Sequence, residues 1–198
     1  FYKGARPHVR TILSPLLFFS SIYGIILKMR SFLYMAGLLK KRQLNAKVIS
    51  VGNLTVGGTG KTPMVIAIAE ILMKNNKKTA VLSRGYKSQG EGKLKIVSDG
   101  NEIKLDTVSA GDEPYLMAER LKGVSVLICP DRYESGRYAI ENLGADTIIL
   151  DDGFQNFAIK KDIDILLIDA MNPFGSGYLL PRGTLRELLS AIKRANII

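Results

Sequence analysis

Residues 48–64 read VISVGNLTVGGTGKTPM, in which a short run rich in β-branched residues leads into a glycine-rich turn followed by Lys61 and Thr62. A strand, an anion-facing turn and the N-terminus of an amphipathic helix are the parts of a phosphate-binding loop, in which the Lys reaches the β and γ phosphates and the Thr ligates Mg²⁺. The pattern G-x-x-x-x-G-K-[ST] wants a glycine five residues before Gly60, where this chain has Thr55. The residues predicted to contact a nucleoside triphosphate are Thr55, Val56, Gly57, Gly58, Thr59, Gly60, Lys61 and Thr62.

Short apolar runs alternate with longer amphipathic segments from Val48 onward. Near-continuous apolar runs such as TIIL and IDILLI are typical of a parallel sheet that helices cover on both faces, so we predict an α/β, P-loop NTPase-like fold. Ligands of such sheets bind at the carboxyl ends of the strands. The expected strands are 48–51, 79–83, 125–129, 147–150 and 163–168, with a hairpin formed by 94–97 and 102–105. The expected helices are 61–75, 114–121, 133–143 and 185–195.

Carboxylates follow two of the expected strands. The run TIIL ends in Asp151 and Asp152, and an acidic strand end of this kind holds Mg²⁺ beside a phosphate loop, directly or through water. Two solvated turn aspartates before Gly153 are the alternative. Asp169, which ends the run ILLID without a neighbouring acid, is a second candidate of lower rank.

The stretch AGDEP at 110–114 opens an expected helix and allows two interpretations. In one, Asp112 or Glu113 caps the helix while Pro114 takes its first position. In the other, Asp112 is a general base that accepts a proton from an attacking hydroxyl. The residues alone leave both open.

Basic residues stand at three further positions. Arg132 follows the strand SVLIC and either contacts a transferring phosphoryl group or pairs with a local acid. Arg84, in SRGYK, follows another strand and is a candidate for contact with an anionic substrate or a lipid head group. Arg186 is expected to form no more than an ion pair with Glu187 on a helix face.

Residues 1–47 carry the basic character of the chain. They hold nine Lys or Arg and no Asp or Glu, whereas the other residues hold 19 basic and 18 acidic side chains. Between Arg10 and Lys28 lie uncharged residues, TILSPLLFFSSIYGIIL, slightly fewer than the ~20 of a full span. We predict that 1–47 is a hydrophobic helical membrane anchor, spanning or interfacial, on the cytoplasmic side, and that 48–198 is the nucleotide-binding core. A buried core helix is the alternative, and the lack of a small-residue cleavage site disfavours a signal peptide.

Cysteine and histidine are scarce. The single cysteine, Cys129, excludes an internal disulfide and fits a reducing compartment. The single histidine, His8, is expected at the surface. Without a Cys/His cluster, a zinc site is not expected.

Together the motifs resemble one family, the tetraacyldisaccharide 4'-kinases, or lipid A 4'-kinases. The matching stretches, in the family's order over 48–187, are VGNLTVGGTGKTP, SRGY, AGDEP, DR, DDGFQ and NPFGSGYLLPRGTLRE. A glycine-rich loop alone is common, but this combination is highly specific, and the hydrophobic N-terminus resembles the family's membrane anchor. The resemblance implies ATP-dependent phosphorylation of the 4'-hydroxyl of a tetraacyldisaccharide 1-phosphate, a step of lipid A biosynthesis at the cytoplasmic face of the inner membrane.

The resemblance also implies roles for individual residues. Lys61 acts on the phosphates of ATP, Asp112 is the catalytic base, and Arg132 lies near the phosphates. The implied metal ligands are Thr62, Asp151, Asp152, Gln155 and Glu187, with Arg186 beside them. The implied cofactors and partners are ATP, Mg²⁺, the acylated disaccharide phosphate and an anionic membrane surface. A monomer without a nucleic-acid partner is expected.

Three features depart from the family's pattern. Asn156 stands where a histidine is usual, and LPRGTLRE carries Arg182 and Thr184 where the family has LPAGPLRE. The resemblance also implies a C-terminal lobe that supplies a histidine to assist the catalytic Asp, and we expect this lobe to be missing from the present sequence. Two alternatives to a kinase are therefore a nucleotide-binding module without full activity and a membrane-tethered P-loop NTPase. The guanine-reading motif N-K-x-D, which would favour a nucleotide switch, does not occur.

Overall fold

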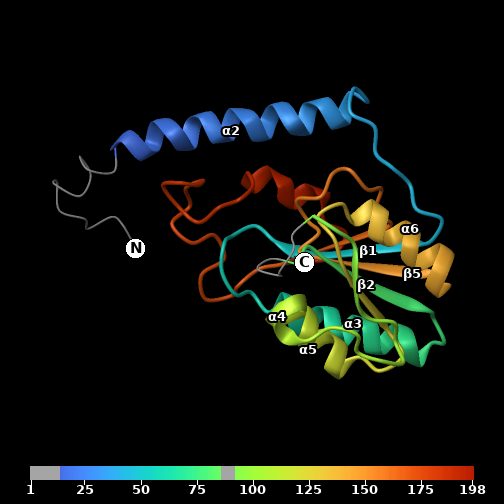
Figure 1. The fold of residues 1–198 in the computed structure, drawn as a ribbon. Helices are drawn as coiled ribbons and strands as arrows, with labels where there is room; N and C mark the ends of the chain where they lie inside the picture. Colours follow the sequence, from blue (N-terminus) through green and yellow to red (C-terminus); the bar gives the residue numbers. More distant parts are fainter. Residues whose placement is uncertain (1–13, 86–91) are drawn as a thin grey trace.

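One six-stranded sheet, in the order β3-β4-β2-β5-β1-β6, forms the centre of the computed structural model, which describes residues 14–85 and 92–198 (Figure 1). Neighbouring strands pair in parallel except β3 and β4, which are antiparallel. The bounds are β1 Lys47–Asn53, β2 Thr79–Ser83, β3 Lys95–Ser98, β4 Ser125–Ile128, β5 Thr147–Asp151 and β6 Ile163–Leu167. The prediction of a mostly parallel α/β sheet is confirmed.

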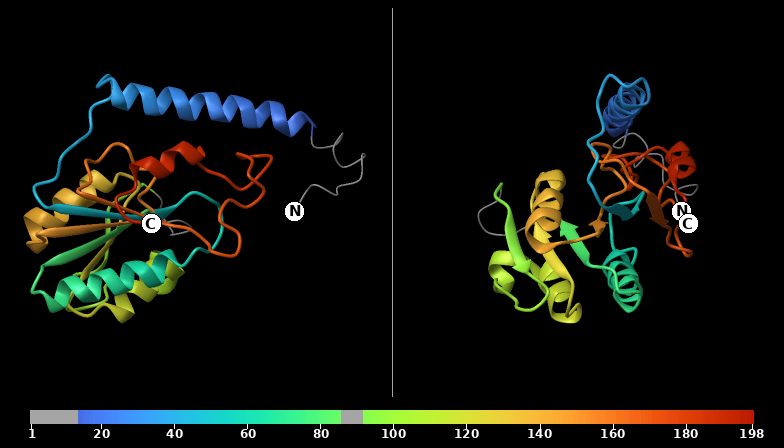
Figure 2. Two further views of the ribbon diagram at one scale, coloured as in Figure 1. Left: turned by 180° about the vertical axis from the view of Figure 1, so that it is seen from behind. Right: turned by 90° about the vertical axis from the view of Figure 1, so that its right-hand side faces the viewer.

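Helices cover both faces of this sheet. α3 (Lys61–Lys74) and α5 (Asp112–Arg120) pack on one face, and α6 (Arg132–Leu143) packs on the other (Figures 1 and 2). Two buried apolar clusters result, one on each side of the sheet. β2, β4 and β5 are buried along their whole length, which explains their continuous apolar sequence. The strand direction brings the carboxyl ends of β1, β2, β4, β5 and β6 to one edge, where the predicted site residues gather.

The expected hairpin is only half present. β3 pairs with β4, but the arm expected at 102–105 makes a single bridge, between Ile103 and Ser98, and is not a strand. The Asp99 side chain accepts the backbone N–H of Asn101 and Glu102, which tightens the turn. The prediction of a turn is therefore confirmed. The prediction of a strand at 102–105 is wrong, because these residues form only one bridge with β3.

The prediction of a helix at 185–195 is wrong for the first half of this range. Leu185 forms bridges with Thr55 and Leu179, so its backbone is extended. A 3₁₀ helix, η1 (Leu189–Arg194), follows. The apolar spacing of LRELLSAI imitates a helix, but long-range strand-type hydrogen bonds determine the structure here.

α2 (Ser14–Met35) is a 22-residue helix that lies apart from the sheet. The short helix η1 lies between α2 and the sheet (Figures 1 and 2). Among the described residues, α2 is the one helix that is long and apolar enough to cross a membrane. Only 17% of its most apolar 18-residue stretch is buried. Among the residues that the structure describes, α2 is therefore not a buried core helix.

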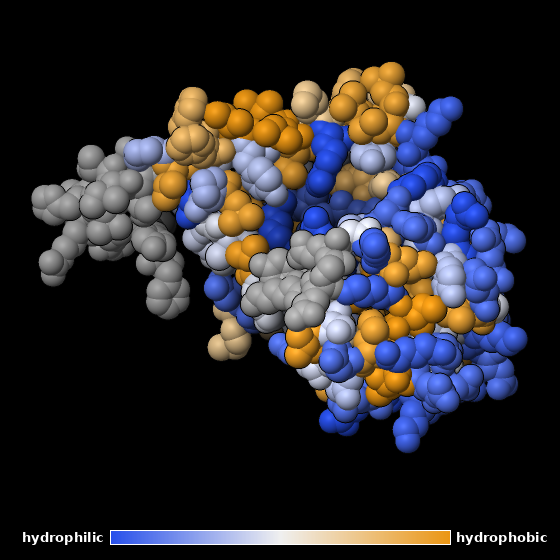
Figure 3. All heavy atoms as spheres, in the orientation of Figure 1, coloured by the Kyte–Doolittle hydropathy of each residue, from blue (hydrophilic) through white to orange (hydrophobic). Residues whose placement is uncertain are grey.

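α2 also turns its polar side toward the body of the protein. Ser20, Gly24 and Leu27 are buried and Tyr23 is half-buried. The outer side exposes large apolar residues, which are Phe18, Phe19, Ile22, Ile25, Ile26, Met29 and Phe32. Figure 3 shows hydrophobic surface along the top of the molecule, where α2 lies. A helix on the surface of a soluble domain has the opposite orientation, with its apolar stripe facing the core.

Candidate active site

The glycine-rich loop begins later than its sequence pattern indicates. Thr55 forms an antiparallel bridge with Leu185. The Val56 backbone N–H donates to the Thr184 carbonyl oxygen at 2.8 Å. Thr55 therefore occupies a paired, extended backbone that needs no glycine. Val56 was predicted to contact the nucleotide, but its backbone N–H already binds a protein oxygen and is not free to bind phosphate.

The turn itself has the geometry of an anion cradle. Gly57 and Gly60 have positive φ angles, 125° and 75°, which favour glycine. A Cβ atom added at Gly57, Gly58 or Gly60 would meet nothing within 4 Å, so the space beside the loop is open. Gly60 precedes α3 and provides no side-chain cap, which leaves the first amides of the helix directed at this space. Lys61 is the first residue of α3.

Asp152 lies at the centre of a cationic cluster. Arg186 donates to both carboxylate oxygens of Asp152 at 2.8 Å, and Lys61 Nζ lies 3.9 Å from Asp152 Oδ1. Asn53, at the end of β1, accepts hydrogen bonds from Arg186 and from Lys61. Burial acts to raise the pKa of Asp152, but the Arg186 hydrogen bonds and the positive charges of Arg186, Lys61 and Arg132 outweigh it and lower the pKa below its ordinary value. Asp152 is thus held as a carboxylate beside the loop.

Asp151 has a different environment from its neighbour. It is buried, and its Oδ2 accepts from the Ser83 hydroxyl at 2.9 Å. Its Oδ1 is buried without a hydrogen-bond partner, and its backbone oxygen accepts from Arg132 Nη2 at 3.0 Å. Burial raises the pKa of Asp151 despite the Ser83 hydrogen bond, and the charges of Asp152 and Glu113 add to this effect.

The start of α5 rules out the first interpretation of AGDEP, in which Asp112 or Glu113 caps the helix. Gly111 is the residue before the helix, so Asp112 and Glu113 lie within the first turn, and no side chain caps it. The expected cap is wrong because Gly111 also ends the short helix α4 (Thr107–Ala110), which leaves the acids no room before the helix. Asp112 is exposed and has no hydrogen-bond or ion-pair partner in the part of the chain that the structure describes. The general-base interpretation stays a prediction.

The predicted metal ligands do not form one closed set. Within residues 14–85 and 92–198, no three His, Cys, Asp or Glu side chains are grouped so as to hold a metal ion. Gln155 Nε2 donates to the Asn53 carbonyl oxygen at 2.7 Å, while its Oε1 is buried and unpartnered. Glu187 accepts from Arg30 at 2.6 Å. The expected ion pair between Arg186 and Glu187 is wrong, because the two side chains bind different partners.

A basic cavity of about 440 Å³ opens next to this cluster, beneath α2. Figure 3 shows the surface hollowed there, between the apolar helix and the body. Four arginines and one carboxylate line it, so it favours an anion. The lining residues are Tyr23, Arg30, Tyr34, Arg84, Arg132, Asp152, Gln155, Asn156, Phe157, Ala158 and Arg186. Tyr86 and Lys87 of the SRGYK stretch lie outside the described residues.

Sequence reasoning missed the contribution of α2 to this cavity. Tyr23, Arg30 and Tyr34 all line it, and they follow one another at intervals of seven and four residues, which are neighbouring positions on one side of a helix. This spacing of polar residues within an apolar segment was the available signal. It indicates a helix that docks on protein through its polar side.

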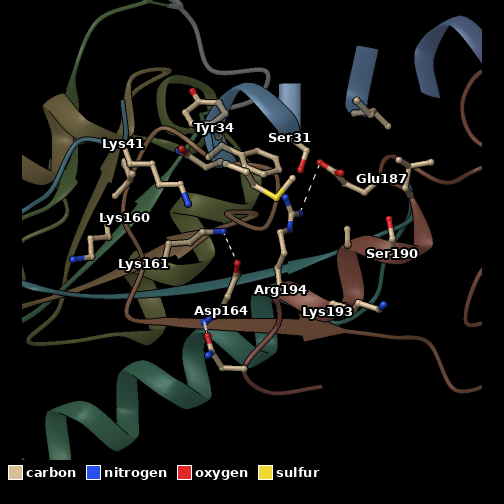
Figure 4. Close-up of a pocket in the computed structure, with 18 of the residues that line it drawn as sticks. Ser31, Tyr34, Lys41, Lys160, Lys161, Asp164, Glu187, Ser190, Lys193 and Arg194 are labelled. Carbon is tan, nitrogen blue, oxygen red and sulfur yellow. Dashed lines mark hydrogen bonds and ion pairs between the residues drawn. The ribbon is translucent and has the colours of Figure 1, made fainter. Parts of the chain in front are cut away.

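A second cavity, of about 750 Å³, lies at the C-terminal end of α2 (Figure 4). Lys161 Nζ donates to Asp164 Oδ2 at 2.6 Å, and burial lowers the pKa of Lys161. Arg194 Nη2 lies 4.0 Å from Glu187 Oε1, and its guanidinium stacks 4.1 Å from the Phe157 ring centroid. Two ion pairs, Lys161–Asp164 and Arg194–Glu187, thus lie within the lining of this cavity.

The three residues that depart from the family pattern, Asn156, Arg182 and Thr184, make contacts within their own region of the structure. Asn156 Oδ1 accepts the Ala158 backbone N–H at 3.0 Å. The Arg182 guanidinium lies 3.7 Å from the Tyr178 ring centroid. Thr184 supplies the carbonyl that binds the amide of Val56.

A glycine-rich loop between β1 and α3, an acidic end on the neighbouring strand β5, and a Lys and an Arg converging on it define a nucleotide-binding protein of the P-loop class. A family model described as tetraacyldisaccharide-1-P 4'-kinase matches residues 12–198. The chain therefore belongs to the tetraacyldisaccharide 4'-kinase family.

Individual relatives agree with this assignment. A tetraacyldisaccharide 4'-kinase from Geobacter metallireducens is 48% identical over 96% of this chain and 56% of the relative, and one from Halothermothrix orenii is 49% identical over 88% and 46%. A crystal structure of the "apo" form of LpxK from Aquifex aeolicus in complex with ATP superposes with a TM-score of 0.86 at 45% identity, over 93% of this chain and 57% of that one. The chain spans about half the length of the curated relatives it matches.

Proposed function

We propose that this chain carries the nucleotide site and part of the acceptor site of a lipid kinase. The kinase transfers the γ-phosphate of ATP to the 4'-hydroxyl of a tetraacyldisaccharide 1-phosphate. One observation carries the proposal: an open phosphate loop and the Lys61–Asp152–Arg186 cluster adjoin a cavity rich in arginine, and an outwardly apolar helix forms one wall of that cavity. Family membership supports the same reaction.

In this reaction the loop binds the donor. The backbone amides from Gly57 to Thr62 and the Lys61 ammonium neutralise the β and γ phosphates. Arg132 and Arg186, which both line the basic cavity, stabilise the charge that develops on the transferring phosphoryl group. ATP then displaces Lys61 and Arg186 partly from Asp152, their partner in the structure.

The oxygen atoms beside the loop fit a magnesium ion. Asp151 Oδ1, Gln155 Oε1 and Thr59 Oγ1 are buried without hydrogen-bond partners, and Mg²⁺ prefers oxygen ligands, usually one or two carboxylates completed by phosphates and water. Asp151, Asp152 and Thr62 are the residues that would hold it, and the ion would neutralise phosphate charge. Gln155 and Glu187 are further candidates, although Glu187 would have to leave Arg30.

The acceptor hydroxyl needs a base and an orientation. Its oxygen attacks the γ phosphorus, its proton passes to the Asp112 carboxylate, and the bond from phosphorus to the β–γ bridging oxygen breaks, which releases ADP. Asp112 is exposed in the first turn of α5, unpaired within the described residues, and is thus available to accept the proton. The arginine-lined cavity suits the phosphate that the acceptor already carries.

Membrane association follows from the outer side of α2. Seven large apolar residues in a row are exposed there, and contiguous apolar surface of this kind marks an interaction site. We assign it to the lipid bilayer at the cytoplasmic face, where ATP and an acylated acceptor meet. Basic residues in the second half of the helix and after its C-terminal end, among them Lys28, Lys40 and Lys41, favour an anionic leaflet.

The test is transfer of ³²P from γ-labelled ATP to the tetraacyldisaccharide 1-phosphate in mixed micelles. Labelled lipid is expected from the wild-type protein and a large loss from Lys61→Ala, with Lys74→Ala, at the other end of α3, as the matched control. Consumption of ATP with release of free phosphate and no labelled lipid would contradict the proposal and favour an NTPase.

A second candidate function is that of a nucleotide-binding module without full transfer activity. It is favoured by Asp112, the proposed base, which no side chain among the described residues orients. The same assay on this chain, alone and extended with the C-terminal half of a relative, separates the two. Nucleotide binding by both forms with transfer by the longer form alone would assign this chain the role of a module.

A further inference from the structure

α2 is attached to the body at two consecutive residues of the active site. Tyr23 Oη donates to the Arg186 carbonyl oxygen at 2.9 Å, and Arg30 Nη2 donates to Glu187 Oε1 at 2.6 Å. We propose that Tyr23 and Arg30 are positioning residues that hold Arg186 against Asp152, so that the membrane-facing helix completes the phosphate site. This inference rests on the proposed kinase function.

The helix geometry explains why one element reaches both residues. Tyr23 and Arg30 are seven residues apart, about two turns, and therefore lie on the same side of α2. Ser20, one turn before Tyr23, accepts the Arg182 backbone N–H and donates to the Leu179 carbonyl. The polar side of α2 is thus bonded along its length to the segment that presents Arg186.

Arg186 is consequently held from two directions. Its backbone N–H donates to the Leu54 carbonyl at 2.7 Å, next to the phosphate loop, while its own carbonyl accepts from Tyr23. With the backbone fixed on both sides, the guanidinium extends to Asp152 with two hydrogen bonds of 2.8 Å. A residue fixed in this way loses little entropy when it engages a phosphate, which is how preorganised sites gain rate.

Several contacts also hold the Arg30 side chain in place. Its guanidinium lies 4.8 Å from the Phe157 ring centroid, and Tyr34 stacks on the same ring at 5.4 Å. Its partner Glu187 is only 4% exposed, and the next cation, Arg194, is 4.0 Å away. Loss of Arg30 would leave a buried carboxylate poorly paired, and such a group relaxes by moving its backbone or by taking up a proton.

The alternative is a direct role in binding. Tyr23 and Arg30 both line the basic cavity, so either could touch the acceptor. A residue that binds ground state and transition state equally raises KM without changing kcat, whereas loss of an interaction made only in the transition state lowers kcat. Because Arg186 acts on the phosphoryl group, positioning predicts a fall in kcat with little change in the acceptor KM.

The experiment compares Tyr23→Phe with Ser21→Ala in the membrane-bound kinase assay. Tyr23→Phe removes one hydroxyl and keeps the ring, while the Ser21 hydroxyl bonds only within the helix, to the Leu17 carbonyl. Tyr23→Phe is expected to lower kcat roughly three- to tenfold, as the loss of one hydrogen bond would, with acceptor KM and vesicle binding unchanged. Ser21→Ala should match the wild type in all three measurements.

Arg30 provides a second, independent arm. Arg30→Gln is expected to lower kcat by more than Tyr23→Phe, about ten- to a hundredfold, because a buried charge loses its partner. Arg30→Lys, which keeps the charge, should recover part of the loss. A raised acceptor KM at wild-type kcat in both variants would overturn the inference, as would wild-type values of both constants. Absence of transfer by the wild-type protein itself would instead contradict the proposed function.

Discussion

α5 and α2 both reach the candidate active site, yet they are built in opposite ways. α5 buries Met117 and Ala118 in the core and exposes its charged residues. α2 turns Tyr23 and Arg30 toward the protein and exposes residues such as Ile25, 65% accessible, on its outer side. The first arrangement is that of a helix with water outside, and the second is the one expected for the lipid-facing helix that we propose.

The two helices also contribute to the site in different ways. α5 carries Asp112 at its first turn on a helix that the core holds in place. α2 contributes hydrogen bonds that hold Arg186 and Glu187, residues of another segment. One helix presents a candidate catalytic group directly, and the other acts through its neighbours. Four predictions sharpen or break this contrast.

The largest effect is expected at the first turn of α5. Asp112→Asn keeps the shape of the side chain but cannot accept the hydroxyl proton, so kcat should fall by about 10² to 10⁴-fold. ATP affinity, measured by calorimetry, should stay within about twofold of the wild type because Asp112 has no role in the phosphate loop. Glu113→Gln is the control and should retain most of the transfer activity. Equal losses in both variants would argue against Asp112 as the base.

Apolar residues of the two helices should differ in their contribution to stability. Met117→Ala in α5 leaves a cavity in the core and should lower the free energy of unfolding by about 2–5 kcal/mol. Ile25→Ala in α2 removes a side chain that touches little protein, so the change should stay within about 0.5 kcal/mol. Urea unfolding in detergent measures both. A large loss for Ile25→Ala would mean that the outer side of α2 is covered by protein.

Membrane binding should show the reverse order. Ile25→Glu introduces a charge on the outer side of α2, and loss of one buried apolar side chain is worth roughly 1.5–3 kcal/mol, so the affinity for anionic vesicles should fall by about ten- to a hundredfold. Glu119→Ala, at an exposed position of α5, should leave it unchanged. Co-sedimentation with vesicles gives both values, and unaltered sedimentation of Ile25→Glu would remove the basis for a lipid-facing helix.

The smallest effect concerns the pH dependence of transfer. Arg186 and the charges of Lys61 and Arg132 lower the pKa of Asp152, so the carboxylate persists as the pH falls until its depressed pKa is reached. Arg186→Lys keeps a charge but loses the two-point contact, which raises this pKa. The acid limb of the kcat/KM profile for ATP, which reports the free enzyme in which Arg186 holds Asp152, should therefore move up by about half to one pH unit. An unmoved or downward-shifted limb would mean that Asp152 does not control it.

Much of the site could be predicted because its signals are local. The strand, glycines and Lys61 are contiguous in sequence, and Asp151 and Asp152 directly follow an apolar run. Parallel strands then bring these segments to one edge of the sheet without further information. Thr55 was the misleading position, because its extended backbone depends on a bridge to Leu185, far along the chain.

The missed features all depend on contacts between distant segments. The Tyr23–Arg186 hydrogen bond joins residues 163 positions apart, and the Arg30–Glu187 pair joins residues 157 apart. Apolar spacing predicted a helix through Arg186 and an ion pair on it. The structure separates Arg186 and Glu187 instead, since extended backbone points successive side chains to opposite sides.

The sequence by itself determined the fold class, the phosphate loop, the acids at the end of β5 and an apolar helix near the N-terminus, because each is encoded by a contiguous pattern and by the periodicity of its backbone. Only the tertiary structure decided which side of that helix meets protein. It also decided that Gly111, not an acid, is the residue that precedes α5, and that Arg186 pairs with Asp152 rather than with Glu187. These outcomes depend on burial and on partners supplied by other segments, which no local pattern specifies.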